Sequence, residues 1–270
     1  MTRICVIGDS HVGAMARGWK KIAQSFPDTE IVFFAAGAAT MAGLAVAGDA
    51  LVAESEELRQ ALTRLGRPTR IGNDFHGFIL CSMGFHSKSA IWLGTTHRGE
   101  DFAADARAPI SNACFAAAIA DAQKQTLLHA TLLKVRRVSA APLLIVATPF
   151  RSVNAEGIGG RGFDPPRDDR PLAALYRRAC NSIARQFDAE FLPQPNETLG
   201  DNVMTTRCAF ASEVGPRSNP DGPREDNVHM NAAYGAVVLE YALETLAADH
   251  PGMSCARRSS QDVAAAALAR

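Results

Sequence analysis

Four short apolar runs divide the chain, and each is continuous rather than alternating with polar residues. A weaker fifth run follows them. Continuous apolar runs of this length are typical of strands inside a parallel sheet, because helices cover both faces of such a sheet. They therefore predict five buried parallel strands, at Ile4–Gly8, Ile31–Ala36, Gly77–Met83, Leu143–Thr148 and Ala189–Leu192.

The segments between these runs have helical character. Strands that alternate with helices predict a doubly wound α/β sheet, with crossovers of the usual right hand. Asn231 is a plausible N-cap for the last helix, because its side chain can accept from a free backbone N–H. The predicted helices are His11–Phe26, Leu51–Leu65, Ala113–Val138, Leu172–Phe187 and Asn231 to about Ala247.

Two stretches lack clear periodicity, Arg151–Pro171 and Asn196–Asn227, and both are rich in loop-forming residues. Long loops inside compact domains often serve as functional lids. The residues from Pro251 to Arg270 mix Ser, Arg and Ala and are expected to form a peripheral tail. We predict one domain over residues 1–250, followed by this tail at 251–270.

The composition suits one large core and excludes some classes of partner. The chain has 270 residues, 47% of them hydrophobic, with 28 Lys and Arg against 28 Asp and Glu. This zero net charge lacks the basic footprint of a nucleic-acid binder and gives no support for charge-driven membrane binding. Small apolar molecules or neutral sugars fit the charge balance better than polyanions do.

No targeting or cofactor signal stands out. The chain enters a strand pattern by Arg3, so no signal peptide is expected, and its apolar stretches are too short to span a membrane. A cytoplasmic location is the expectation. The six cysteines form no CxxC pair and are expected to be reduced and mostly buried.

Neither a metal nor a dinucleotide is expected. The His residues have no i, i+4 pair of the kind that helices use for zinc. The run Gly157–Gly162 has the spacing of a dinucleotide fingerprint, but two prolines follow it instead of a helix, so this interpretation is rejected.

The first chemical motif is Gly8-Asp9-Ser10-His11, which directly follows the first apolar run. Gly8 permits a tight turn from strand to helix. Ser10 then lies at the carboxyl end of the strand, where open α/β sheets bind ligands, and its N–H faces out of a helix N-terminus. A simple helix-capping role for Ser10 is the alternative.

The second motif, Asp226-Asn227-Val228-His229, precedes the last predicted helix. A carboxylate near a histidine can accept from Nδ1–H and leave Nε2 facing a nucleophile, as the base of a serine hydrolase requires. Together the two motifs predict Ser10 as nucleophile, His229 as base and Asp226 as its orienting acid.

These two blocks resemble those of the SGNH hydrolase superfamily, the GDSL-like esterases and lipases. The resemblance extends over roughly Ile4–Leu246 and implies a flavodoxin-like three-layer α/β/α sandwich with a five-stranded parallel sheet. It also implies an oxyanion hole formed by Ser10, by Gly37 after the second strand and by a residue after the third. There the family has Gly-x-Asn-Asp, whereas this chain has Gly84, with His86 in place of Asn and Ser87 in place of Asp.

The resemblance implies a serine esterase that acts on a small acyl ester, for example an acetyl group on a carbohydrate, without a cofactor. Asp9, His11 and Arg151 are candidates for substrate binding, although a solvated loop charge is the simpler interpretation of Arg151. Two alternatives stay open. One is an O-acyltransferase with the same triad, and the other is a non-catalytic module that binds a glycan or an ester, which His86 would suit.

Overall fold

The computed structural model describes residues 1–154, 165–213, 225–253, 255 and 257, and for residues 165–167, 213 and 225–227 it describes the backbone alone. The glycine-rich run at 157–162 and most of the 251–270 tail lie outside these described residues. The division into one domain and a tail therefore stays a prediction.

Five parallel strands form the central sheet, and all five predicted strands are confirmed. They are β1 (Thr2–Gly8), β2 (Thr29–Ala35), β6 (Gly77–Cys81), β9 (Leu143–Val146) and β10 (Glu190–Leu192). Their order in the sheet is β10-β9-β6-β1-β2, which is the flavodoxin-like order. The predicted fold class is thus the one observed.

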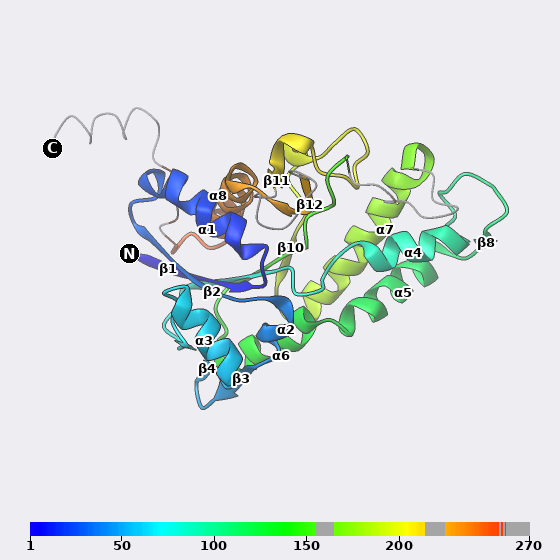
Figure 1. The fold of residues 1–270 in the computed structure, drawn as a ribbon. Coiled ribbons are helices and arrows are strands. Elements are labelled where there is room, and N and C mark those ends of the chain that lie inside the picture. Colours follow the sequence, from blue (N-terminus) through cyan, green and yellow to red (C-terminus); the bar gives the residue numbers. More distant parts are fainter. Residues whose placement is uncertain (155–164, 214–224, 254, 256, 258–270) are drawn as a thin grey trace.

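Alternate side chains of each strand enter separate cores, because successive side chains of a strand point to opposite faces. Ile4 and Val6 of β1 pack beneath α1 (Val12–Ile22) and α8 (Ala232–Asp249). Cys5 and Ile7 enter the larger core on the other face, with α3 (Glu56–Arg64) and α6 (Leu127–Val138). Figure 1 shows the resulting three layers, with α1 and α8 on one side of the sheet and α3 and α6 on the other.

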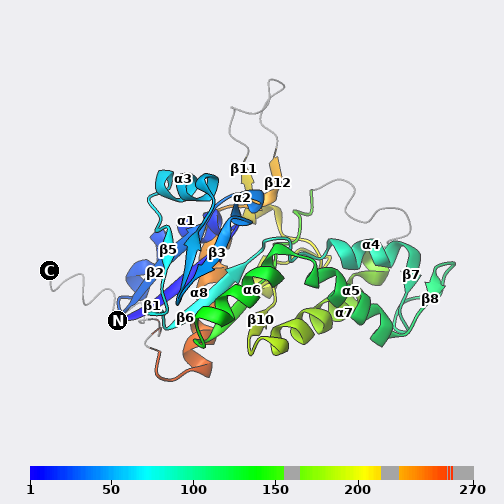
Figure 2. The same ribbon diagram turned by 90° about the horizontal axis from the view of Figure 1, so that it is seen from below.

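A group of helices extends the second layer beyond the edge of the sheet. It consists of α4 (Lys88–Thr96), α5 (Asn112–Lys124) and α7 (Pro165–Gln186), which contact one another. The two-residue strands β7 (His97–Arg98) and β8 (Ala108–Pro109) lie at its far end. Figure 2 shows this group beside the sheet. No described helix is long and apolar enough to cross a membrane.

Two predicted helices differ from the structure. The expected helix at Ala113–Val138 is two helices, α5 and α6, because the Thr126 side chain accepts from the His129 N–H and starts a new helix. The expected helix at Leu51–Leu65 begins only at Glu56, after the N-cap Ser55. The residues before it form β4 (Ala50–Ala53), which pairs antiparallel with β3 (Leu44–Ala47) and β5 (Arg70–Ile71).

The loop predicted at Arg151–Pro171 is shorter in the structure, because α7 begins at Pro165. Proline suits a first helical turn, where its missing N–H would have no helical partner. Pro171 lies inside the helix despite its breaking tendency. The described structure also contains short helical segments at Ala23–Ser25, Ala38–Met41 (α2), Asn196–Thr198 and Cys208–Phe210.

The other predicted loop, Asn196–Asn227, contains part of an antiparallel ribbon. Strand β11 (Ala211–Glu213) pairs with β12 (Glu225–Met230). In β12 the apolar alternation is limited to Val228 and Met230, which is too short a pattern to reveal a strand. His229 consequently lies on a strand. Asn231 follows as the confirmed N-cap of α8, where its side chain accepts from Ala233 and Tyr234.

Candidate active site

Ser10 lies in the turn between β1 and α1, at the carboxyl edge of the sheet. A side chain at Gly8 would overlap the carbonyl oxygen of Cys81 on β6, so only glycine allows this approach. The helix then starts at once, with the Val12 N–H donating to the carbonyl of Asp9. Ser10 is exposed, and its own N–H makes no hydrogen bond to a described residue.

His229 reaches Ser10 from the other end of the chain. Its Nε2 lies 2.9 Å from the Ser10 Oγ, within hydrogen-bond distance. The ring of His11, only 9% exposed, stacks against the His229 ring at a centroid distance of 5.1 Å and an interplanar angle of 29°. The structure thus brings together three predicted site residues, Ser10, His11 and His229.

The backbone of Asp226 lies on the same strand, but its side chain is outside the described part of the molecule. The pairing of the ribbon is irregular here, since Asp226 faces Ser212 whereas Met230 faces the preceding residue, Ala211. The strand is therefore irregular between Asp226 and Met230 and does not follow simple two-residue alternation. The contact between the Asp226 carboxylate and His229 stays a prediction.

Asp9 has an internal role in the structure, and its contact with substrate stays a prediction. It is 6% exposed, and both oxygens of its carboxylate are occupied by protein donors. Oδ1 accepts from the His11 N–H at 3.1 Å, and Oδ2 accepts from the Ser82 hydroxyl at 2.9 Å and the Met83 N–H at 2.8 Å. Asp9 therefore joins the start of α1 to the segment that follows β6.

That segment is a left-handed turn. Ser82 and Met83 have φ angles of 67° and 49°, and Gly84 follows with 85°. Non-glycine residues in this region cost about 1–3 kcal/mol each and persist where surrounding contacts hold them. Here the two bonds to Asp9 hold them, and the turn directs the chain to His86.

His86 is half-buried, and its carbonyl accepts from the amide of Gln123, a buried residue of α5, at 2.8 Å. Its Nδ1 is buried without a hydrogen-bond partner among the described residues. Burial lowers the pKa of His86, and the nearby charges of Lys88 and Arg151 lower it further. These effects favour the neutral imidazole, which carries one ring N–H that can donate.

Gly37 and Arg151 are less closely tied to the serine. Gly8 pairs with Ala35, so Ser10 and Gly37 each lie two residues beyond the ends of adjacent parallel strands. Gly37 is exposed and caps α2. Arg151 is exposed, and its charge acts on His86.

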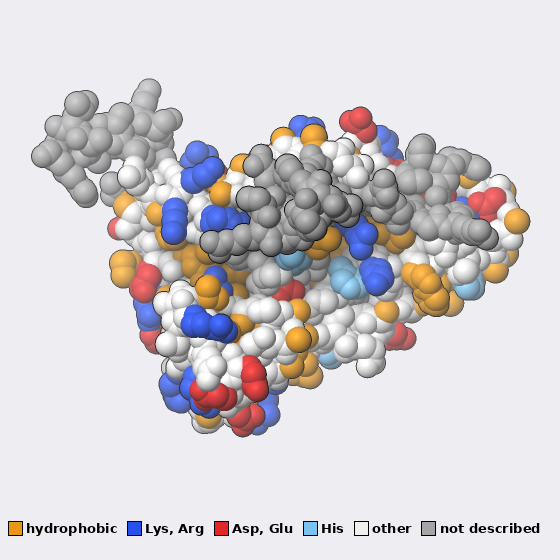
Figure 3. All heavy atoms as spheres, viewed as in Figure 1, with side chains coloured by type: hydrophobic (Ala, Val, Ile, Leu, Met, Phe, Trp, Pro, Cys, Tyr) orange, Lys and Arg blue, Asp and Glu red, His pale blue; other side chains and the backbone are white. Residues whose placement is uncertain are grey.

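An open groove of about 730 Å³ surrounds the Ser10–His229 pair. Its described lining includes His11 but not Gly37, His86 or Arg151. Figure 3 shows His, Lys and Arg side chains gathered near the middle of this face of the molecule. Among the described residues, no three His, Cys, Asp or Glu side chains meet as metal ligands would.

The sequence did not predict the groove contacts of several lining residues. Arg17 donates from its guanidinium to the Met230 carbonyl at 3.1 Å and so ties α1 to the end of β12. The Asn231 amide donates to the carbonyl of Ala209 at 2.8 Å. Its capping role was predictable, but this second contact depends on a segment 22 residues away. Cys208 is exposed in the same groove.

Four of the six cysteines are buried, as the sequence interpretation expects. Burial raises the pKa of the Cys5 and Cys81 thiols, which disfavours the reactive thiolate.

Comparison with protein-family models gives no match, and comparison with curated proteins gives none. Two solved structures are similar in chain path. A Streptococcus pneumoniae protein described provisionally as a platelet activating factor is 13% identical, with 90% of this chain and 83% of that chain covered and a TM-score of 0.44. An extracellular lipase from Streptomyces rimosus is 16% identical, with 90% and 100% covered and a TM-score of 0.39. The similarity is loose at these values, so the chemistry of the site is argued from its own geometry.

Proposed function

We propose that this protein is a serine ester hydrolase with Ser10 as nucleophile and His229 as general base. One observation carries the proposal: the Ser10 hydroxyl lies 2.9 Å from the His229 Nε2 at the carboxyl edge of a parallel sheet. An exposed serine beside an imidazole nitrogen, both lining an open groove, is the arrangement that nucleophilic acyl transfer needs.

The reaction would follow the two steps of acyl transfer to water. His229 takes the Ser10 proton as the hydroxyl oxygen attacks the ester carbonyl, and it returns that proton to the leaving alcohol. Water then attacks the acyl-enzyme with His229 again as base, which releases the acid and free Ser10. Asp226 would orient the imidazole and stabilise its charged form.

The oxyanion of the tetrahedral intermediate needs preorganised donors. The Ser10 N–H lies at the start of α1, where the helix dipole favours negative charge, and no described residue accepts its hydrogen bond. We assign this N–H as the first donor, with the Gly37 N–H as the second. Neutral His86 would assist with its ring N–H once substrate is bound.

The proposed substrate is a small acyl ester, such as an acetyl group on a carbohydrate. The groove is open, and polar groups of Ser10, Arg17, Ser212 and Asn231 line it. Such a surface suits a hydroxyl-rich alcohol portion better than a long apolar chain.

Release of p-nitrophenol from p-nitrophenyl acetate tests the proposal. Ser10→Ala and His229→Ala should each abolish most of the activity, and the double variant should be little worse, because residues of one catalytic unit are not additive. Asp226→Ala should lose less. A wild type with no esterase activity towards p-nitrophenyl acetate or acetylated sugars would contradict the proposal, as would losses at Ser10 and His229 that multiply.

A further inference from the structure

A second cavity, of about 270 Å³, lies at the carboxyl ends of β9 and β10, between α7 and α8. Its floor is apolar and consists of Val146, Leu192 and Val238, all of which are buried. At this volume the cavity is just below the usual range for drug-sized ligands, so it suits a small apolar body.

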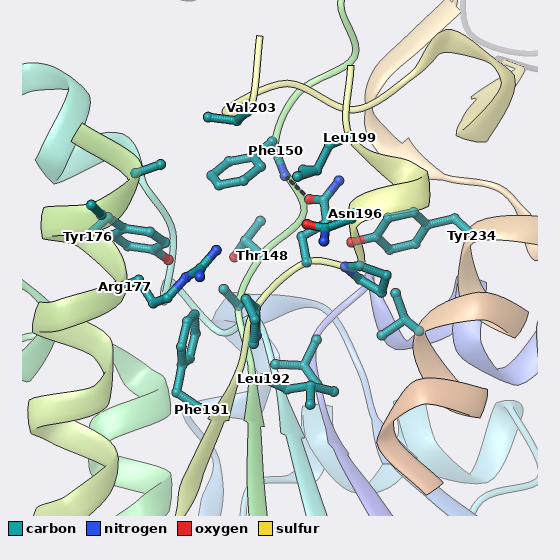
Figure 4. A pocket seen from close by; sticks show the side chains of 18 of the residues that line it. Thr148, Phe150, Tyr176, Arg177, Phe191, Leu192, Asn196, Leu199, Val203 and Tyr234 are labelled. Carbon is teal, nitrogen blue, oxygen red and sulfur yellow. Dashed lines mark hydrogen bonds between the residues drawn. The ribbon is translucent and has the colours of Figure 1, made fainter. Parts of the chain in front are cut away.

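Two arginines of α7 stand at this cavity, Arg170 and Arg177. Both are exposed, and neither forms an ion pair with a described residue. Figure 4 shows the Arg177 side chain turned into the cavity, between Tyr176 and Thr148. A cation that projects over an apolar floor, with no ion-pair partner among the described residues, favours an anionic group on the ligand.

The wall beside Arg177 holds a further polar group. Tyr176 is 3% exposed, and its hydroxyl interacts with the Cys180 thiol of the same helix. In Figure 4 this hydroxyl points to the same region as the Arg177 guanidinium. Since the Tyr176 hydroxyl has a partner in Cys180, Tyr176 serves as the wall of the cavity and Arg177 supplies its free donors.

The cavity is distinct from the serine groove, since no described residue lines both. Tyr234 of α8 lines the cavity, and its ring contacts the ring of Phe210 at a centroid distance of 6.2 Å. The neighbours of Phe210 in the chain, Ala209 and Ala211, line the groove. The Phe210–Tyr234 pair therefore stands between the two spaces.

We propose that this cavity is a binding site for a small amphiphilic carboxylate, with its chain on the apolar floor and its carboxylate on Arg177. The guanidinium offers two parallel N–H donors to the carboxylate, which is the geometry that Arg prefers for such anions. This site goes beyond the proposed hydrolysis and does not depend on Ser10.

Calorimetric titration with octanoate, octylamine and 1-octanol tests the site. Octanoate should bind the wild type more tightly than either other probe. Arg177→Gln should weaken octanoate binding by about 10-fold or more, because a hydrogen bond to a charged group is lost. Arg178→Gln is the matched control, since Arg178 is the next residue of α7, is exposed, and does not line the cavity. Ala174→Trp, at an exposed lining position, should block the site without removing a charge.

Ser10→Ala should bind octanoate as the wild type does. The binding site and the proposed hydrolysis are therefore tested separately, and either proposal can be wrong while the other holds. The proposal is overturned if octylamine binds as tightly as octanoate, or if Arg178→Gln weakens binding as much as Arg177→Gln. It is also overturned if Ser10→Ala abolishes binding, which would place octanoate in the serine groove, or if the wild type binds none of the three probes.

Discussion

Gly18 of α1 and Gly235 of α8 lie against each other where the two helices cross. A Cβ on Gly18 would overlap the backbone nitrogen of Ala236, and a Cβ on Gly235 would overlap the carbonyl oxygen of Ala14. Only glycine on both helices allows this approach. Because α1 begins just after Ser10 and α8 begins just after β12, the crossing sets how far His229 lies from Ser10.

Gly235→Ala should therefore reduce both stability and activity. The added methyl group must push α8 away from α1, and overpacking of this kind typically costs about 1–3 kcal/mol. We expect a lower midpoint in urea unfolding and a lower kcat, since His229 moves with α8. Gly13→Ala is the control, because a Cβ there meets only the flexible end of Arg17 at 3.4 Å. Equal stability and kcat in the two variants would show that the crossing is not tight.

Asp9→Asn should weaken the turn that follows β6. The substitution keeps the shape of the side chain but removes the charge that accepts from Ser82 and Met83. Loss of such bonds costs about 1–3 kcal/mol, so the free energy of unfolding should fall by this amount. Asp201→Asn, at an exposed position, should leave the free energy of unfolding unchanged. An Asp9→Asn variant as stable as wild type would mean that the left-handed turn is stable without its hydrogen bonds to Asp9.

The proposed role of His86 in the reaction is to donate its ring N–H to the oxyanion. If its ring N–H supports the oxyanion, His86→Ala should lower kcat by about 10² to 10³ with little change in KM. His86→Asn restores an amide donor and should recover part of the loss. Steady-state kinetics on p-nitrophenyl acetate measure both effects. An unchanged kcat in His86→Ala would leave the oxyanion to backbone donors alone.

His86 should also make the fold sensitive to acid. Burial lowers the pKa of the folded-state imidazole below its ordinary value of 6.5, so the unfolded chain binds a proton that the folded chain does not. Stability is then lost as the pH falls from about 7 through the ordinary pKa towards the lowered one. His86→Asn should lose less melting temperature between pH 7 and 5.5 than wild type does. His250→Asn, at an exposed position, should follow the wild-type curve.

Alkylation of Cys208 should block hydrolysis, because this exposed thiol lines the groove around Ser10. N-Ethylmaleimide should therefore inactivate wild type, and Cys208→Ser should resist it. Cys114→Ser is the matched control, since Cys114 is equally exposed but lies on α5, away from the groove. Mass spectrometry of the modified chain checks which thiols react. Full alkylation at Cys208 with activity retained would argue that substrate does not occupy this side of the groove.

Local pattern was enough to predict the sheet and the position of the serine. Strands buried on both faces must be apolar throughout, so β1, β2, β6 and β9 are readable as continuous runs without any partner. Ser10 follows from the same reasoning, because a strand that ends at Gly8 must place the next residues at the carboxyl edge. Asn231 was predictable as a cap, since capping depends on residues within one turn.

Features that depend on residues far apart in the chain are set only by the tertiary structure. The polar strand β12 is a strand because β11 pairs with it, and Asp9 is buried because Ser82 and Met83, more than 70 residues away, donate to it. The glycines at positions 18 and 235 are ordinary helical residues in the sequence, and their contact exists only where α1 and α8 cross. Hydrophobic periodicity reports the face that an element buries, whereas the partner of a polar or glycine residue is set by the packing of elements far apart in the chain.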